Sequence, residues 1–96
     1  MSEAAFLLLL ACAQDAASLL HMDAPAIAID DALPWKGAYV YSTVILRPDA
    51  DCGVVFHELV HHRQFRDTGG PPLTDYEWRL REFNARRLEI MYRESH

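Results

Sequence analysis

The chain has 96 residues, a formal net charge of −5 and 51% hydrophobic residues, a composition typical of a folded globular protein and unlike that of a disordered chain. A chain of this length buries one modest core, so we expect a single domain spanning residues 1–96. Lys36 and Arg47 are the only basic residues before His57, and after it seven arginines are balanced by seven acids, which excludes the basic stripe of a nucleic-acid binder.

The first predicted element is a helix over residues 2–21, which are rich in Ala and Leu and contain no Gly or Pro. Apolar residues on nearly all sides of its first half indicate a position in the core. The apolar run of residues 4–13 has no basic segment before it and is too short to span a bilayer, so we expect no membrane association. Cys12 and Cys52 form no CxxC pair, and we expect free thiols in a reducing, cytoplasmic compartment.

Strands are predicted within residues 26–47. Residues 26–29 are a short apolar run flanked by Pro25 and by two aspartates, which favours a brief strand. Residues 38–46 (AYVYSTVIL) are dense in β-branched and aromatic side chains and form either one long strand or a hairpin that turns near residues 41–43.

Two helices follow the strands. The first is predicted over about residues 52–66, capped by Asp49 or Asp51 and ended by the Gly-Gly-Pro-Pro segment at 69–72. The second is predicted over about residues 75–93, capped by Thr74 or Asp75. The order of elements predicts an α+β fold, in which a small two- to three-stranded sheet, mixed or antiparallel, packs on three helices.

The predicted helix over residues 52–66 carries an HExxH motif. His57 and His61 are four residues apart, so their imidazoles project from one face of the helix, about one turn from each other. This spacing lets one helix offer two nitrogens to a single zinc ion. Glu58 points about 100° away from His57, where it can accept a proton from a metal-activated water and pass it to a leaving amine.

A catalytic zinc usually has three protein ligands, and the last helix offers Glu77, Glu82 and Glu89. We favour Glu82, because the 21 residues after His61 suffice for a Gly-Pro turn and about two turns of returning helix. Small Ala85 lets the two helices approach closely. Each predicted ligand has an alternative role without a metal. The two histidines can be partly buried helix residues that form hydrogen bonds with carboxylates, and Glu82 can form an ion pair with a neighbouring arginine.

The segment His57-Glu58-Leu59-Val60-His61, followed by Gln64 and by an ExxA stretch at residues 82–85, resembles the gluzincin zinc metallopeptidases, most closely the minimal members of that clan. The resemblance covers about residues 38–91. It implies a minimal zincin-like domain with zinc on His57, His61 and Glu82, and with Glu58 as the general base. It also implies that an extended peptide adds to the strand within residues 38–46.

We therefore expect a zinc-dependent, peptidase-like hydrolase that acts on a peptide or protein substrate. The donor that stabilises the developing oxyanion is left open among four residues, which are His62, Tyr76, Arg79 and Tyr92. The alternative function is a catalytically weak or inactive zinc-binding module that binds a peptide or a partner protein at its strand edge. The sequence does not decide the oligomeric state.

Overall fold

The structure is a computed structural model that describes all 96 residues. Three helices and three strands follow one another in the order α1 (Glu3–Leu19), β1 (Ala26–Ile29), β2 (Gly37–Val40), β3 (Thr43–Leu46), α2 (Cys52–Thr68) and α3 (Asp75–Ser95). The predicted α+β class, with a small sheet packed on three helices, is confirmed.

The three strands form a mixed sheet in the order β1-β3-β2. β1 runs parallel to β3, and β2 runs antiparallel to β3. Of the two forms expected for residues 38–46, the structure has the hairpin. Its two turn residues, Tyr41 and Ser42, have positive φ angles of 46° and 65°, which match the turn that best joins two twisted strands. β2 therefore lies at one edge of the sheet, with only one strand beside it.

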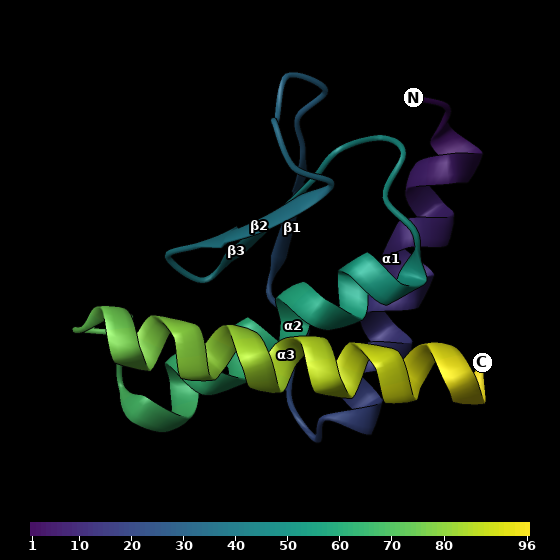
Figure 1. The fold of residues 1–96 in the computed structure, drawn as a ribbon. Coiled ribbons are helices and arrows are strands. Elements are labelled where there is room, and N and C mark those ends of the chain that lie inside the picture. The colour runs from purple at the N-terminus through teal and green to yellow at the C-terminus, as the bar shows by residue number, and fades with distance from the viewer.

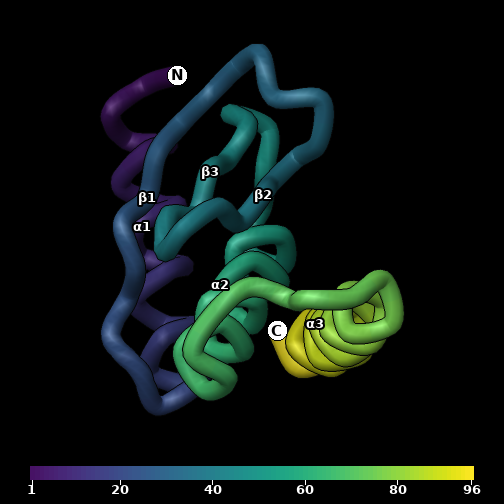
Figure 2. Tube along the Cα trace, turned by 90° about the vertical axis from the view of Figure 1, so that its left-hand side faces the viewer, coloured from purple at the N-terminus to yellow at the C-terminus, as the bar shows by residue number.

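Helix α2 occupies the centre of the molecule. In Figure 1 the sheet lies above α2, and α3 crosses in front of it. The rotated view in Figure 2 shows α1 on one side of α2 and α3 on the other. Val55 and Leu59 of α2 are completely buried, as are Val44 and Leu46 of β3. A side chain on α2 can therefore contact the sheet or either of the other helices, according to the direction in which it points.

Both long helices in the C-terminal half begin at a capping side chain. Asp51 caps α2 by accepting a hydrogen bond of 3.0 Å from the backbone N–H of Val54. Thr74 caps α3 in the same way, at 3.0 Å from the N–H of Glu77. Such caps satisfy backbone donors that the helix itself leaves unpaired. Of the residues expected as caps, the structure selects Asp51 and Thr74.

Helix α1 is buried on one face only, so the expectation that its first half lies within the core is wrong. Leu7 and Leu8 are 55% and 64% exposed. The buried face carries mainly small side chains, among them Ala13 and Ala16, and it packs against α2. Because α1 lies at the outside of the molecule, it has a neighbour on one side and solvent on the other.

Cys12 and Cys52 form a disulfide, so the expectation of two free thiols is wrong. The bond joins the middle of α1 to the first residue of α2, and the two Cα atoms lie 5.2 Å apart. The residues are 40 positions apart in the sequence, and only the packing of α1 on α2 brings them together. The cytoplasmic location was expected because the thiols were expected to be reduced, and the cysteines no longer support it.

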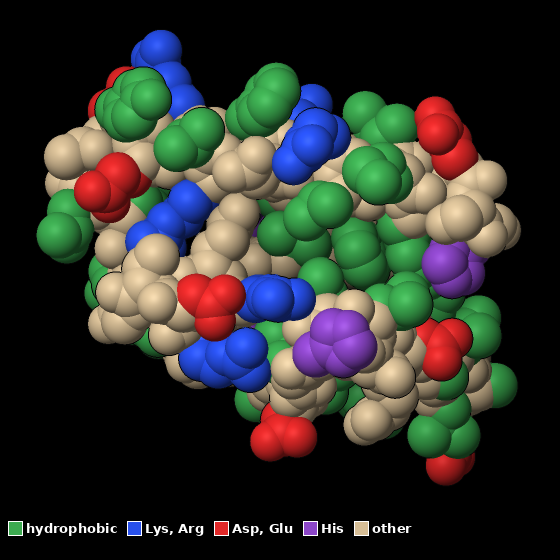
Figure 3. Space-filling model, turned by 90° about the horizontal axis from the view of Figure 1, so that it is seen from below, with side chains coloured by type: hydrophobic (Ala, Val, Ile, Leu, Met, Phe, Trp, Pro, Cys, Tyr) green, Lys and Arg blue, Asp and Glu red, His purple; other side chains and the backbone are tan.

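The surface mixes charged and apolar side chains. Figure 3 shows the face seen from below, where acidic and basic side chains are interspersed and hydrophobic side chains gather between them. Helix α3 exposes large apolar side chains, with Tyr76, Phe83 and Ile90 at 74%, 64% and 57% exposure. None of the helices combines the length and the apolar composition that crossing a bilayer requires.

Candidate metal centre

The candidate metal centre lies where α2 packs against α3. His57 and His61 point from α2 toward α3, and their ring centroids are 4.9 Å apart. Ala85 of α3 is completely buried, so the expectation that a small residue here allows close approach agrees with the structure. The close packing of the two helices brings a carboxylate of α3 within reach of both imidazoles.

The Nε2 atoms of both histidines converge on the carboxylate of Glu82. His57 Nε2 lies 3.1 Å from Glu82 Oε1, and His61 Nε2 lies 2.9 Å from Glu82 Oε2. The three residues offer one ligand atom each, all within 4.8 Å of one another. Two atoms bound to one zinc ion at about 2 Å lie roughly 3 to 4 Å apart, so this group can hold a metal ion after small side-chain movements.

The other ring nitrogen of each histidine is already engaged. His57 Nδ1 lies 2.8 Å from Glu89 Oε1, and His61 Nδ1 lies 2.9 Å from Gln64 Oε1. The side-chain amide of Gln64 donates to the carbonyl of Arg81 at 3.0 Å, so its oxygen faces His61 and accepts the Nδ1 proton. The ionised carboxylate of Glu89 is likewise an acceptor. These two acceptors favour the tautomer with the proton on Nδ1 when a cation is bound, and that tautomer would leave the lone pair of each Nε2 free for the cation.

The pKa of Glu82 reflects this placement. Partial burial raises the pKa of the Glu82 carboxyl, but the charges of His57 and His61 and their hydrogen bonds lower it by more, and the net shift is downward. The contacts with the two imidazoles therefore favour the ionised form of the Glu82 carboxylate, which is the form that binds a cation.

Glu58 lies in the same cleft and is only 8% exposed. Burial is the main reason that the pKa of its carboxyl is raised to about 7, and the negative charges of Glu82 and Glu89 add to the rise. No group of the protein hydrogen-bonds to this carboxylate, and no fully buried polar side-chain atom in the structure lacks a partner. The Glu58 oxygens therefore reach the surface of the cleft, where they can contact water.

The cleft has a volume of about 850 Å³ and is bounded by β2 on one side and by α3 on the other. All four residues of β2, Gly37–Val40, line it together with His57, Glu58, His61 and Glu82. The free edge of the sheet therefore runs beside the candidate metal centre.

None of the four residues considered as oxyanion donors lines this cleft. Tyr76 and Arg79 are exposed, and Arg79 pairs with Asp75 at 3.0 Å. Tyr92 stacks on Phe56 with ring centroids 4.5 Å apart. His62 is hydrogen-bonded to the hydroxyl of Tyr39 at 2.6 Å.

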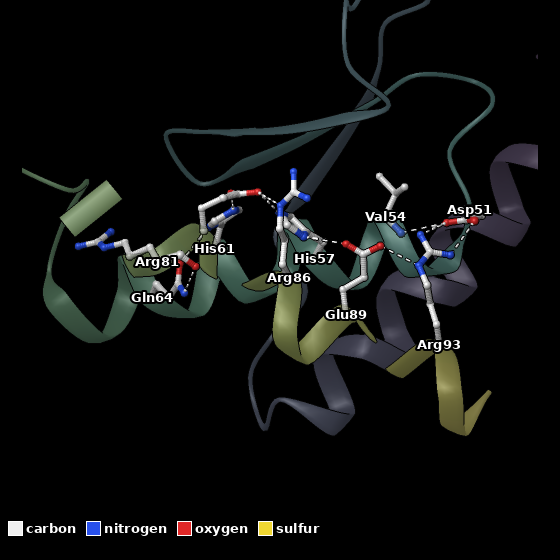
Figure 4. Close-up of polar contacts among 10 residues, drawn as sticks. Asp51, Val54, His57, His61, Gln64, Arg81, Arg86, Glu89 and Arg93 are labelled. Carbon is white, nitrogen blue, oxygen red and sulfur yellow. Dashed lines mark hydrogen bonds and ion pairs between the residues drawn. The ribbon is translucent and has the colours of Figure 1, made fainter. Parts of the chain in front are cut away.

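A different cation, Arg86, lies at the site. Its Nε atom is 3.5 Å from Glu82 Oε1, and its side chain is 75% exposed. In Figure 4 it extends from α3, between His61 and Glu89, toward the sheet. Arg86 follows Glu82 by four residues, about one turn of helix, and it is one of the neighbouring arginines with which the sequence allows Glu82 to pair.

Two other residues of the site were given a different role or none by the sequence. Glu89 was considered as a ligand but instead binds the Nδ1 atom of His57. Arg93 has no role in the site predicted from the sequence, and in the structure it donates to Glu89 Oε2 at 2.7 Å. The spacing from Glu82 to Glu89 is two helical turns, and from Glu89 to Arg93 one turn, so helical periodicity places the three on one face.

Comparison with family models, curated proteins and solved structures gives no match to this chain.

Proposed function

We propose that this protein is a zinc-dependent peptidase that resembles the gluzincins and hydrolyses a peptide bond in its cleft. The observation that supports the proposal most directly is the convergence of His57 Nε2, His61 Nε2 and the Glu82 carboxylate, beside a buried Glu58 that has no partner. The geometry of these three residues alone is sufficient for them to hold a metal ion.

The donor set supports zinc as the metal. Two imidazole nitrogens and one carboxylate form the ligand set of several catalytic zinc sites, which keep a further position for water or substrate. Magnesium and calcium prefer oxygen ligands, so the two nitrogens argue against them. Zinc bound here supplies a Lewis acid that polarises the scissile carbonyl and acidifies water.

Glu58 is proposed to move the proton. Its carboxylate accepts a proton from the attacking water and then donates it to the nitrogen of the leaving amine, so that the C–N bond breaks without release of an amide anion. A pKa near neutral suits both steps, and burial produces such a value in the metal-free protein. A bound dication would lower this pKa and favour the form that accepts the proton.

Arg86 is proposed to stabilise the negative charge that develops on the carbonyl oxygen. Its guanidinium lies at the metal centre, lines the cleft and makes only a 3.5 Å contact with Glu82. A flexible, largely exposed arginine can move toward a substrate oxygen, and it keeps its charge over the whole working pH range.

The substrate is proposed to bind as an extended chain along β2. Val40 and Thr43 flank the two-residue turn and form a hydrogen-bonded pair, so the pairs alternate from there along the hairpin. The N–H and C=O groups of Gly37 and Tyr39 consequently point away from β3, toward the side of the strand that has no neighbour. They offer the hydrogen bonds by which a peptide adds to a sheet edge.

Replacement of Glu58 by Gln tests the proposal. We expect E58Q to bind zinc as the wild type does but to lose hydrolysis of a denatured protein by about 100-fold or more. Elemental analysis of protein purified without added zinc, and a turnover assay on both forms, are the measurements. Glu94 is exposed and has no partner, so E94Q is the matched control and should keep full activity. Equal hydrolysis by E58Q and wild type would remove Glu58 from this role.

A second function, a zinc-binding interaction module without turnover, is supported by the absence of all four expected oxyanion donors from the cleft. Such a module would hold zinc and bind an extended peptide at β2 without cleaving it. Turnover separates the two functions: zinc-loaded wild type that binds peptides but leaves them intact over many hours is the module.

A further inference from the structure

We propose that Arg93 is a positioning residue for the metal centre, which acts by fixing Glu89 and through it the ring of His57. The inference rests on the proposed metal site and extends it to a residue that touches no ligand directly. Figure 4 shows the series of contacts, which begins at Asp51 and passes through Arg93 and Glu89 to His57.

The first link is the carboxylate of Glu89, which binds on both sides. Its Oε1 atom accepts from His57 Nδ1 at 2.8 Å, and its Oε2 atom accepts from Arg93 Nε at 2.7 Å. The His57 side chain is 12% exposed and that of Glu89 is 22% exposed, so this link lies partly out of solvent. Without Arg93, a glutamate on a helix surface would populate several rotamers, of which only some reach the imidazole.

The second link attaches Arg93 to the start of α2. Its two terminal nitrogens donate to the two carboxylate oxygens of Asp51, at 2.9 Å and 3.0 Å. This is the bidentate geometry that sets a guanidinium in one orientation. Asp51 also caps α2 through the N–H of Val54, so it is itself fixed on the helix that carries His57.

Gly53 provides the space that this arrangement needs. A Cβ atom built on Gly53 would overlap the guanidinium carbon of Arg93. The glycine is buried in the first turn of α2, where its own helix does not require it. Its presence is explained by the arginine, which lies directly over the backbone of that turn.

The ion pairs of Arg79 and Arg47 do not connect to a metal-ligating residue as the pair of Arg93 with Glu89 does. Arg79 pairs with Asp75 on the same helix, and both side chains are about three-quarters exposed. Arg47 pairs with Asp49 near the start of α2 but reaches no residue of the metal centre. Arg93 alone joins the cap of α2 to a partner of a proposed ligand, so it does more than a surface ion pair.

The experiment compares zinc affinity and the state of the His57 ring in three full-length variants. R93M removes all hydrogen-bond donors of the side chain. R93K keeps a charged donor for Glu89 but cannot form the bidentate contact with Asp51. R79M is the matched control on α3. Affinity is measured by competition with a chromophoric chelator. The hydrogen bond is followed by NMR of the Nδ1 proton of zinc-bound His57, a signal that a purely structural role for Arg93 would leave unchanged.

We expect R93M to bind zinc about 10- to 100-fold more weakly than wild type and to lose the protected Nδ1 proton signal of His57. R93K should recover part of the affinity, and R79M should match the wild type. If R93M does not fold, G53A supplies the test, because it keeps the arginine and displaces its guanidinium. It should reproduce the weaker binding.

The outcomes separate this inference from the proposed function. Wild type without zinc affinity overturns the metal site and the inference together. Wild type that binds zinc, with R93M or G53A equal to R79M in both affinity and the His57 signal, overturns the positioning role alone and leaves the metal site standing.

Discussion

Gly37 of β2 lies directly against Glu58 of α2. A Cβ atom built on Gly37 would be 2.7 Å from Val54 Cγ1, 3.1 Å from Glu58 Cγ and 3.2 Å from Glu58 Oε2. The glycine therefore lets the edge strand of the sheet approach the proposed proton acceptor without a side chain between them. This contact joins the two parts of the proposed active site, which are the strand that aligns substrate and the carboxylate that moves the proton.

Gly37→Ala should disturb that contact. The added methyl group displaces Val54 and the Glu58 side chain, so we expect a loss of stability of about 1 to 3 kcal/mol and lower turnover at unchanged zinc content. Thermal unfolding, zinc analysis and the hydrolysis assay measure the three effects. At Gly70 an added Cβ meets nothing within 4 Å, so Gly70→Ala is the control. Wild-type turnover in Gly37→Ala would show that the close approach has no role in the reaction.

The raised pKa of Glu58 should make the metal-free protein less stable as the pH rises. A carboxyl with a pKa of about 7 when folded and about 4.5 when unfolded binds its proton more tightly in the folded state. The folded state therefore loses stability between about pH 4.5 and pH 7, by roughly 3 kcal/mol. In E58Q this contribution is absent, because the amide does not titrate.

The measurement is the free energy of unfolding of both proteins in urea with a chelator present, at several pH values. We expect the stability of E58Q relative to wild type to increase from pH 4.5 to pH 7 and to stay constant above it. Comparison of the two proteins at each pH removes the contribution of the titrating groups that they share. A difference that does not change with pH would contradict the raised pKa.

Zinc should stabilise the folded protein through its three ligands. At a free zinc concentration of 100 times the dissociation constant, the gain in the free energy of unfolding is about 2.7 kcal/mol, and removal of the metal by a chelator should reverse it. Glu82→Gln should lose most of this gain, since it removes the ligand toward which both Nε2 atoms point. Glu77 accepts a hydrogen bond of 2.9 Å from the N–H of Leu73 and does not belong to the group of three metal-ligating residues, so Glu77→Gln should keep the gain. An equal zinc-induced shift of the melting temperature in both variants would exclude Glu82 as a ligand.

The disulfide should contribute strongly to stability. It closes a loop of 40 positions, for which the loss of chain entropy in the unfolded state corresponds to about 4 kcal/mol. We expect a reductant to lower the unfolding midpoint of the wild type in urea, and to have no effect on the double variant Cys12→Ala, Cys52→Ala. A wild type that unfolds at the same urea concentration with and without reductant would contradict this contribution.

Local patterns in the sequence were sufficient to predict the helices and strands and to place His57 and His61 on one face of a helix. Helix and strand periodicity, the breakers at residues 69–72 and the capping residues depend on neighbours within about one turn, and the structure agrees with them closely. The four-residue spacing of His57 and His61 fixes their common face on any helix. The choice of Glu82 followed from loop length and helical rise, and the structure brings it to both imidazoles.

Other features depend on contacts between distant parts of the chain, and only the tertiary structure decided them. The packing of α1 on α2 pairs Cys12 with Cys52, and the packing of β2 on α2 places Gly37 against Glu58. The ion pair between Arg93 and Asp51 joins residues that are 42 positions apart in the sequence. The sequence does not show which partner a hydrogen-bonding group or a thiol will have, because many arrangements of the chain would satisfy these groups equally well. The packing of the buried core selects one arrangement, and the partners follow from it.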